Sequence, residues 1–475
     1  MITGSEMAIV DENAAALGVS QKQLMESSGN AIARTVRELV APGDQVTIVA
    51  GRGNNGGDAF VAARFLEAFD LRILLLGREE LIGTEISREN WDALDVGQFD
   101  RAEVRDSTDL ELGDPDLVVD AMLGTGVSGS LREPVASAAA AINDYDGTVL
   151  SVDVPSGLNT ETGELPAGAV EPDHVITFHD TKPGLQNLDA PVTVADIGIP
   201  RAASEFVGPG DLRRLSRDPD SHKGEHGEIL VIGGGPYVGA PALSAQAALR
   251  AGADLVRVSC PTAVAHEIQG YSENLILRPF EGRELEPGHV GQVMEFAAEH
   301  DVLVIGPGLG ESKSTLEAAE AILTGFDGTA IVDADPLQIV PKIDTEATLI
   351  CTPHQGELAK MGGPQETDWR KRRDAVTEFA AELGHTLLVK GRYDIVSNGE
   401  RTRANRTGNP GMTVGGTGDV LAGVTGALAA MHEPIHAAGL GAYVTGGAGD
   451  LSAEKWGNGL VATDLLDEIP QAMKR

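Results

Sequence analysis

The chain has 475 residues, of which 42% are hydrophobic and 4% aromatic, and its 72 acidic residues outnumber its 36 basic ones to give a formal net charge of −36. This composition excludes disordered, collagen-like and coiled-coil proteins and indicates a globular chain of two or three domains. Because so acidic a protein repels phosphate groups, we expect neither a nucleic-acid partner nor an anionic membrane partner.

The acidic residues are scattered along the chain, and only ten of the basic residues are lysines. This balance is typical of proteins that work in concentrated salt, so we predict a halophilic protein. The alternative is an acidic protein from a mesophile. Two cysteines cannot build a disulfide framework, and the first residues lack the features of a signal peptide, so we expect a cytoplasmic protein. The uncharged stretch 229–249 has glycines and prolines in its middle, which predicts strand, loop and helix and not a membrane span.

Short apolar runs alternate with alanine-rich helical patterns, which predicts an α/β fold with parallel sheets. Segment 207–227 is rich in Gly, Pro, Asp, Arg and Ser without apolar periodicity, so we predict domains of residues 1–215 and 216–475. The expected helices include 21–40, 59–69 and 420–431, and the expected strands are 46–50, 72–76, 117–120, 148–152, 174–178, 229–232, 255–259, 302–305, 330–332, 348–351 and 386–389.

Four polar segments of the first half follow predicted strands, at the edge where parallel sheets carry their chemistry. The first, Gly51–Asp58, satisfies Gly-x-Gly-x-x-Gly between a strand and a helix. Its two Asn and one Asp suit a ribose, an amide or a cation better than a phosphate; a tight turn capped by Asp58 is the structural alternative. The other three segments are Asp120–Gly126, Val152–Leu158 and Phe178–Leu185.

Together these segments resemble the amino-terminal domain of the bifunctional NAD(P)H-hydrate repair enzymes, a Rossmann-like NAD(P)HX epimerase, over nearly all of residues 1–205. The resemblance implies that a potassium ion is held by Asn55, Asp120 and Ser156, whose oxygens suit a hard cation. It also implies that Asp153 contacts the substrate near the reacting carbon, and Lys182 is a second candidate there. The other implied substrate contacts are Asn54, Asn55, Gly56, Gly57 and Asp58, with a phosphate-side loop of Gly124, Thr125, Gly126, Val127, Ser128, Gly129 and Ser130.

Glycine-rich turns also follow predicted strands in the second half, at Gly233–Pro241 and Ile305–Gly310. Ahead of the first turn lies His222–Gly227, with two His and a Lys; a loop that faces the substrate is favoured over a metal site because no third ligand is near. Two further polar pairs are predicted at strand ends, one in Asp333-Ala334-Asp335 and one in Thr352–Glu357.

The sharpest feature of the second half is Asn409–Asp419, directly before a long Ala/Gly/Leu helix. Gly415–Gly418 would present free N–H groups at the helix start, an anion hole for a transferring phosphoryl group. Asp419 would take a proton from an attacking hydroxyl. This pattern is typical of ribokinase-like folds, a capped buried helix is the structural alternative, and the absence of a Walker motif excludes P-loop chemistry.

Residues 222–474 resemble the ADP-dependent NAD(P)HX dehydratase domain of the same bifunctional enzymes. The resemblance implies that Asp419 is the base. It places Ala240, Gly308, Leu309, Gly310, His354 and Asp419 on the hydrated nucleotide, and ADP on Lys390, Gly391, Arg392, Tyr393, Asp394, Gly415, Gly416, Thr417 and Gly418.

The sequence thus predicts a two-domain repair enzyme. One half would interconvert the R and S epimers of hydrated NAD(P)H, and the other would dehydrate the S epimer at the expense of ADP, giving NAD(P)H, AMP and phosphate. We expect K⁺ in the first domain, Mg²⁺ with the nucleotide, and a homo-oligomer. The alternatives are a nicotinamide-dependent dehydrogenase, which needs an acidic residue at the end of its second strand, a small-molecule kinase with a stable product, and a non-enzymatic nucleotide-binding module.

Overall fold

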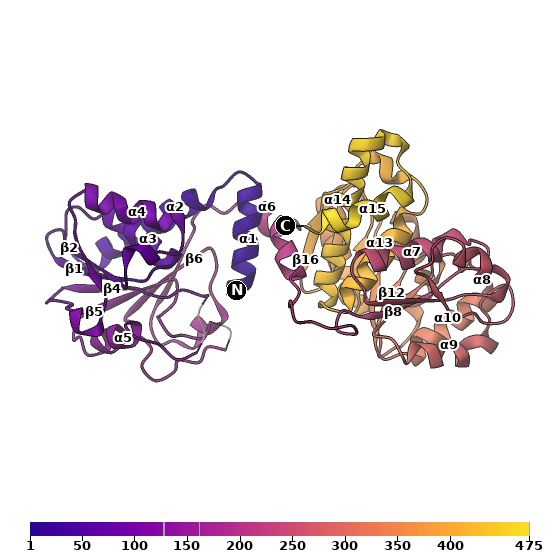
Figure 1. The fold of residues 1–475 in the computed structure, drawn as a ribbon, viewed down its shortest axis with the longest axis horizontal. Coiled ribbons are helices and arrows are strands. Elements are labelled where there is room, and N and C mark those ends of the chain that lie inside the picture. Colours follow the sequence, from indigo (N-terminus) through magenta and orange to yellow (C-terminus); the bar gives the residue numbers. More distant parts are fainter. Residues whose placement is uncertain (127–128, 161, 475) are drawn as a thin grey trace. The chain divides into compact units, whose positions relative to one another are not determined.

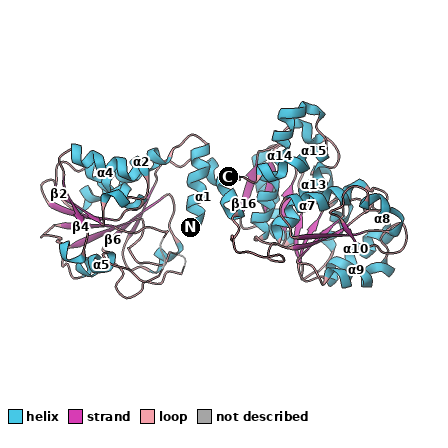
Figure 2. Cartoon of the chain, viewed as in Figure 1, coloured by secondary structure: helices cyan, strands magenta, loops and turns pink. Residues whose placement is uncertain are grey.

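The computed structural model describes residues 1–126, 129–160 and 162–474, and the chain divides into two compact units, Met1–Ala203 and Ser204–Arg475. Each unit has its own sheet with helices on both faces, which confirms the predicted α/β class (Figure 2). The division lies ahead of the boundary predicted near residue 215.

The boundary is displaced because the irregular segment after Ser204 is anchored on the second unit. The Val207 amide donates to the Ala404 carbonyl at 2.9 Å. The Phe206 ring packs 5.5 Å from Trp369, and the Arg403 guanidinium pairs with the buried Asp211 carboxylate. The start of the segment without apolar periodicity is therefore irregular but packed against the second unit.

The first unit is a seven-stranded parallel sheet in the order β3-β2-β1-β4-β5-β6-β7. Its strands are β1 (Gln45–Ala50), β2 (Asp70–Leu76), β3 (Asp100–Val104), β4 (Leu117–Ala121), β5 (Thr148–Val152), β6 (His174–Phe178) and β7 (Val192–Ala195). Its helices are α1 (Gly4–Ala16), α2 (Gln21–Leu39), α3 (Asn54–Arg64), α4 (Glu85–Val96), α5 (Val135–Asn143) and α6 (Arg201–Glu205), the last of which crosses the division. The strand order reverses between β1 and β4, which is where open α/β sheets bind ligands.

Alternating residues of the central strands enter two separate cores. Ile48 on β1 packs beneath α2 and α3, whereas its neighbour Val49 packs towards α5 on the other face. Figure 1 shows α2, α3 and α4 together on one face of this sheet and α5 on the opposite face. Burial on both faces explains why β1 and β4 are continuous apolar runs, the pattern from which they were predicted.

The second unit is a nine-stranded sheet in the order β10-β9-β8-β11-β12-β13-β14-β15-β16. Its strands are β8 (Glu228–Ile232), β9 (Leu255–Ser259), β10 (Ile276–Leu277), β11 (Val302–Ile305), β12 (Thr329–Val332), β13 (Thr348–Cys351), β14 (Thr386–Val389), β15 (Asp394–Ser397) and β16 (Thr402–Asn405). Its helices are α7 (Gly239–Arg250), α8 (Thr262–Gln269), α9 (Val290–Ala297), α10 (Lys313–Gly325), α11 (Gln355–Lys360), α12 (Trp369–Leu383), α13 (Thr417–Ala429), α14 (Pro434–Trp456) and α15 (Ala462–Ala472). Figure 1 shows α7 and α13 above the sheet and α9 and α10 below it.

All eleven predicted strands are present, within two residues of their predicted bounds. The sheet is not wholly parallel, however, because β15 and β16 form an antiparallel extension of β14. Their four-residue lengths and polar ends give little sequence signal. The uncharged stretch 229–249 forms β8, a loop and α7 as predicted, and no described helix is long and apolar enough to cross a membrane.

Candidate functional sites

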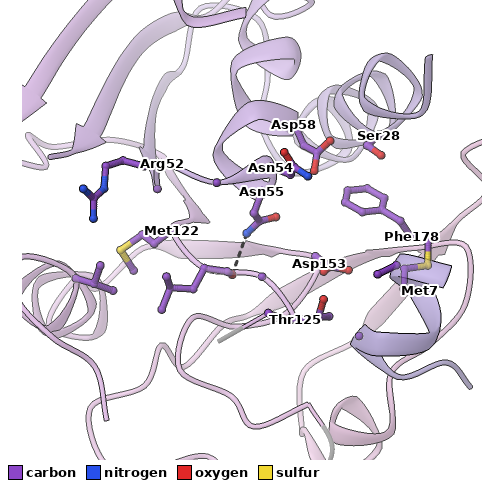
Figure 3. Close-up of a pocket in the computed structure, with 18 of the residues that line it drawn as sticks. Met7, Ser28, Arg52, Asn54, Asn55, Asp58, Met122, Thr125, Asp153 and Phe178 are labelled. Atoms are coloured by element: carbon purple, nitrogen blue, oxygen red, sulfur yellow. Dashed lines mark hydrogen bonds between the residues drawn. The ribbon is translucent and has the colours of Figure 1, made fainter. Parts of the chain in front are cut away.

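A cavity of about 1280 Å³ opens at the carboxyl edge of the first sheet (Figure 3). It is lined by residues that follow β1, β4, β5 and β6, where the four polar segments were predicted to converge, and by one face of α1. The volume suits a ligand of drug size or larger.

Two glycines let the chain close tightly at the reversal between β1 and β4. A Cβ on Gly51 would lie 1.8 Å from the Met122 carbonyl oxygen, and one on Gly56 would lie 2.0 Å from the Gly51 carbonyl oxygen. A Cβ on Gly57 would likewise lie 2.3 Å from the Ser87 hydroxyl oxygen. Gly56 and Gly57 were predicted to contact the substrate, but they do not line the cavity among the described residues. Gly56 brings α3 close to Gly51 after β1, and Gly57 brings it close to Ser87 on α4 and Met25 on α2.

We predict that Gly51→Ala and Gly56→Ala each lower the free energy of unfolding of the first unit by at least about 1–3 kcal/mol, because backbone must move to admit the methyl group. Gly53→Ala is the matched control, since a Cβ at Gly53 meets nothing within 4 Å. Urea unfolding of the full chain, with epimerase activity as the probe of the first unit, would measure the three effects. Equal stability of all three variants would contradict the prediction.

Asn54–Asp58 are the first turn of α3, so this helix begins five residues earlier than the predicted start at residue 59 and ends at Arg64 instead of 69. Gly53 and not Asp58 is the N-cap. Asn54, Asn55 and Asp58 consequently point from a helix start into the cavity, as Figure 3 shows.

Ser156 contacts Asp120 directly, and Leu123 links this pair to Asn55, since the Leu123 amide donates to the Ser156 hydroxyl at 3.0 Å. Both oxygens of the buried Asp120 carboxyl accept hydrogen bonds, including one from the Ser156 hydroxyl at 2.6 Å, and burial raises the pKa of Asp120. The Asn55 amide nitrogen donates to the carbonyls of Leu123 at 2.9 Å and Val152 at 3.1 Å. The Asn55 amide oxygen is buried and has no hydrogen-bond donor. A buried amide oxygen without a hydrogen-bond donor fits a cation ligand.

Asp153 and Lys182 form a buried ion pair at the cavity. The Lys182 ammonium, 1% exposed, lies 2.8 Å from the Asp153 carboxylate and also donates to the Thr177 hydroxyl at 2.8 Å and the Phe178 carbonyl at 3.0 Å. Asp153 has a φ of +64°, a strained conformation for a residue other than glycine. Such strain at the end of a strand aims the carboxylate into the cavity and is concentrated at functional sites.

The predicted phosphate-side loop follows β4 along the same cavity. Gly124 lies near two other site residues, since its Cβ would be in ordinary van der Waals contact, at 3.5 Å, with the Asp153 carboxylate and with Cβ of Asn55. Val127 and Ser128 lie outside the described residues. The loop residues that line the cavity include Gly124, Thr125, Gly126, Gly129 and Ser130.

The dehydrogenase alternative required an acidic residue at the end of β2 for the ribose. The strand ends at Leu76 and is followed by Gly77 and Arg78, and the first acid, Glu79, already accepts from the Trp91 indole at 2.7 Å. The first acid after β2 is therefore engaged within the protein, which disfavours Glu79 as a ribose ligand.

In the second unit, Asp419 lies in the first turn of α13 beside three charged residues. The Lys390 ammonium is 2.9 Å from the Asp333 carboxylate and 3.7 Å from that of Glu357, and it lies 3.3 Å from the position of a Cβ on Gly418. Burial and Asp333 raise the pKa of Asp419 to about 7, against the effect of Lys390. Asp419 is thus held ready to accept a proton near neutral pH.

The glycine-rich turn before α13 matches the predicted anion hole. Gly416 is the N-cap, in the left-handed conformation with φ +96°, and no side chain caps the helix. The Thr417 hydroxyl donates to the Met412 carbonyl at 2.9 Å, so it fixes the turn, and the first-turn amides are left for a ligand.

The segment Lys390–Asp394 leads from β14 into β15 and is fixed by a hydrogen bond of its own and by contacts with α12. The Gly391 amide donates to the Asp394 carboxylate at 2.9 Å, and burial raises the pKa of Asp394 to about 6. The Arg372 guanidinium donates to the Tyr393 carbonyl at 2.6 Å, and the Tyr393 ring stacks on Trp369 at 5.0 Å. Arg372, which sequence reasoning missed, supports this loop from α12.

Four predicted substrate contacts of the second unit have other contacts in the structure. The Leu309 side chain is 1% exposed in the core, so only its backbone is available. His354 caps α11, its Nδ1 accepting from the amides of Gly356 at 2.9 Å and Glu357 at 3.1 Å. Gly308 and Gly310 both have positive φ, +73° and +80°, and turn the chain below Tyr237 and Pro236. Ala240 opens α7.

Among the described residues, His222 and His226 before β8 are not part of a cluster of metal-ligating side chains. His226 Nδ1 lies 3.5 Å from the Asp254 carboxylate. Across residues 1–126, 129–160 and 162–474, no group of three or more His, Cys, Asp or Glu side chains could hold a metal ion. The preference for a loop over a metal site at His222–Gly227 stays a prediction.

Comparison with known families matches both halves of the chain. The model of the NAD(P)H-hydrate dehydratase family matches residues 229–471, and that of the YjeF-related protein N-terminus matches residues 21–184. Among solved structures, a ribokinase-like superfamily protein of Enterococcus faecalis V583 is similar to the chain, with a TM-score of 0.51 and 23% identity over 57% of this chain and 95% of that one. This likeness confirms the ribokinase-like fold of the second unit.

Curated relatives match over the full length. The bifunctional NAD(P)H-hydrate repair enzyme Nnr of Methanothermobacter thermautotrophicus is 43% identical, over 98% of this chain and 94% of the relative. The enzyme of the same name from Archaeoglobus fulgidus is 40% identical, over 100% of this chain and 98% of the relative. The chain therefore belongs to the family of bifunctional NAD(P)H-hydrate repair enzymes.

Proposed function

We infer that this chain repairs hydrated NAD(P)H, with the first unit epimerising the R and S hydrates and the second dehydrating the S hydrate at the expense of ADP. The observation that carries this function is the arrangement at the start of α13. A carboxyl with a raised pKa, Asp419, lies beside a helix start with free amides and beside the Lys390 ammonium. This arrangement combines a proton acceptor with groups that bind a phosphoryl group.

In the second unit, Asp419 takes the proton of the substrate hydroxyl as the hydroxyl oxygen attacks the β-phosphorus of ADP, and AMP departs. The amides of Gly415–Gly418 and the Lys390 ammonium bind the phosphoryl oxygens as negative charge develops. The phosphorylated substrate then loses phosphate and a proton from the neighbouring ring carbon, which restores the ring double bond. Phosphorylation is needed because hydroxide is a poor leaving group.

Mg²⁺ is expected with the nucleotide, where it neutralises phosphate charge. Asn55, Asp120 and Ser156 are the proposed ligands of K⁺ in the first unit, and the orphaned Asn55 amide oxygen supports this assignment. K⁺ would order the start of α3 against the ends of β4 and β5.

The function predicts full recovery of absorbance at 340 nm when mixed R and S hydrates of NADH are incubated with the protein, Mg²⁺, ADP and molar KCl. Dehydration without epimerisation would stop near the S fraction, provided that spontaneous epimerisation is slow. Release of free phosphate separates a dehydratase from a small-molecule kinase, whose product would keep the phosphate. No recovery with either ADP or ATP would refute the function.

The halophilic, cytoplasmic and oligomeric predictions remain predictions. A single experiment separates the halophilic prediction from the K⁺ site: the salt concentration is varied with KCl or with NaCl. Screening of the −36 charge predicts that the melting temperature rises steeply with either salt. A K⁺ site predicts that epimerase activity at equal ionic strength is higher in KCl than in NaCl. A melting temperature that is insensitive to salt refutes the first prediction, and equal activities refute the second.

A further inference from the structure

The wall of the first cavity that sequence reasoning missed belongs to α1. The helix is fixed by a capping box in which Thr3 accepts from the Glu6 amide and the Glu6 carboxylate accepts from the Thr3 amide. Gly4, Met7, Ala8 and Asp11 line the cavity, and their spacing places them on one face of the helix. Figure 3 shows Met7 of this helix and Phe178 among the residues at the cavity.

Asp11 is an acidic group on a largely apolar wall. Apart from Asp11, α1 contributes only two small residues and one Met to the cavity. Among the described residues, no hydrogen-bond donor or cation contacts the Asp11 carboxyl. A half-buried carboxyl that is not engaged within the protein is available to a ligand in the cavity.

The charged groups around Asp11 come from three other elements: Asp58 on α3, Asp153 after β5, and Lys182 after β6. Burial raises the pKa of Asp11 to about 6, Lys182 lowers it and Asp153 raises it. Burial also raises the pKa of Asp58 well above its usual value, with Asp153 and Asp11 adding to the shift. The cavity thus pairs an ion-paired carboxylate at the sheet edge with protonatable carboxyls on the helices, as acid–base catalysis requires.

We propose that Asp11 is a second acid–base group of the epimerase, working with Asp153 in the same cavity. This proposal rests on the epimerase function inferred above and names a residue that completes its chemistry. Asp11 gives its proton to the hydroxyl of the hydrated ring as the carbon–oxygen bond breaks, the lone pair of the ring nitrogen forms a carbon–nitrogen double bond, and water leaves.

The reverse addition then produces the other epimer. Water adds to the opposite face of the same carbon, its oxygen forms the new bond, the electron pair returns to nitrogen, and the released proton passes to the Asp153 carboxylate. Lys182 holds that carboxylate in place at 2.8 Å. Exchange with solvent returns the two protons, and the two carboxyls exchange roles in the opposite direction.

Asp11→Asn keeps the size and polarity of the side chain and removes its proton transfer. In the full-length protein we expect the kcat for conversion of purified R hydrate to fall about 100-fold or more, with KM nearly unchanged. ADP-dependent dehydration of the S hydrate by the same sample stays unchanged and serves as the folding control. Asp92→Asn, an exposed acid on α4 with no hydrogen-bond partner among the described residues, is the matched control.

A second variant separates proton transfer from support of the fold. Asp11→Ala leaves room for a small carboxylic acid, so formate should restore the epimerase rate of this variant in proportion to the formate concentration. Formate should not change the epimerase rate of Asp153→Asn. An Asp11→Asn rate within threefold of the wild type, an effect on KM alone, or no rescue by formate would each overturn the proposal. A wild-type protein without epimerase activity would instead refute the proposed function. The role of Asp11 is tested separately, by the ratio of the variant rate to the wild-type rate.

Discussion

Asp419→Asn should abolish ADP-dependent dehydration of the S hydrate, with a loss of about 100-fold to 10,000-fold, and leave epimerisation of the R hydrate intact. The amide cannot take the hydroxyl proton, although it fills the same space at the start of α13. Recovery of absorbance at 340 nm from purified S hydrate measures the loss. Asp327→Asn, an exposed acid of the same unit, is the control that should not change the rate. Dehydration that survives Asp419→Asn would show that the base is another residue.

The same carboxyl predicts the pH dependence of dehydration. Because its pKa is raised to about 7 and only the ionised form accepts a proton, the rate should rise with pH through about 7 and level off above it. Asp333→Asn removes a neighbouring negative charge that contributes to the raised pKa, so the midpoint of the profile should move to lower pH. A midpoint that stays in place or moves to higher pH would contradict this electrostatic account.

Asp153→Asn and Lys182→Met should each lower the epimerase rate about 100-fold or more, and the double variant should be no slower than the poorer single variant. The two side chains act as one ion-paired unit, and removing either member disables it, so the effects are not additive. Asn tolerates the left-handed conformation of Asp153, which makes it the conservative substitution at that position. Rates for purified R hydrate, coupled to the intact second unit, measure all three variants.

The pair should also differ from exposed ion pairs in its effect on stability. Lys182→Met leaves an unpaired carboxylate and Asp153→Asn leaves an unpaired ammonium that is 1% exposed; breaking a buried pair in this way costs about 3–5 kcal/mol. Lys22→Met, which breaks an exposed ion pair with Glu89, is the control and should leave both stability and epimerase activity near the wild-type values. Purely additive losses of activity, or single variants as stable as the control, would refute the paired role.

The polar segments of both sites were identified from sequence because parallel sheets place the carboxyl ends of their strands along one edge. Asp120, Asp153 and Lys182 follow three different strands and were therefore expected to meet, and the structure brings them to one cavity or directly below it. Gly415–Asp419 could also be identified from sequence, since glycines before a helix indicate a helix start that binds anions.

The wall formed by α1 was missed, although Thr3 and Glu6 have the spacing of a capping box that signals a helix start. The predicted start of α3 was wrong because Asn54–Asp58 was interpreted as a loop, whereas its polar residues form the first helical turn. His354 was assigned to the substrate from the family resemblance, and its role as the cap of α11 depends on two backbone amides that the sequence does not reveal.

By itself, the sequence determined the α/β class, the eleven predicted strands and the residue types at each strand end, because these depend on local periodicity and chain order. Only the tertiary structure decided which of these residues face a common space. It placed Asp11 of α1 in the same cavity as Asp58, and it placed Gly56 and Gly57 in close packing contacts outside the cavity lining. The physical reason is that burial, charge coupling and backbone approach depend on contacts between distant segments, which local patterns do not encode.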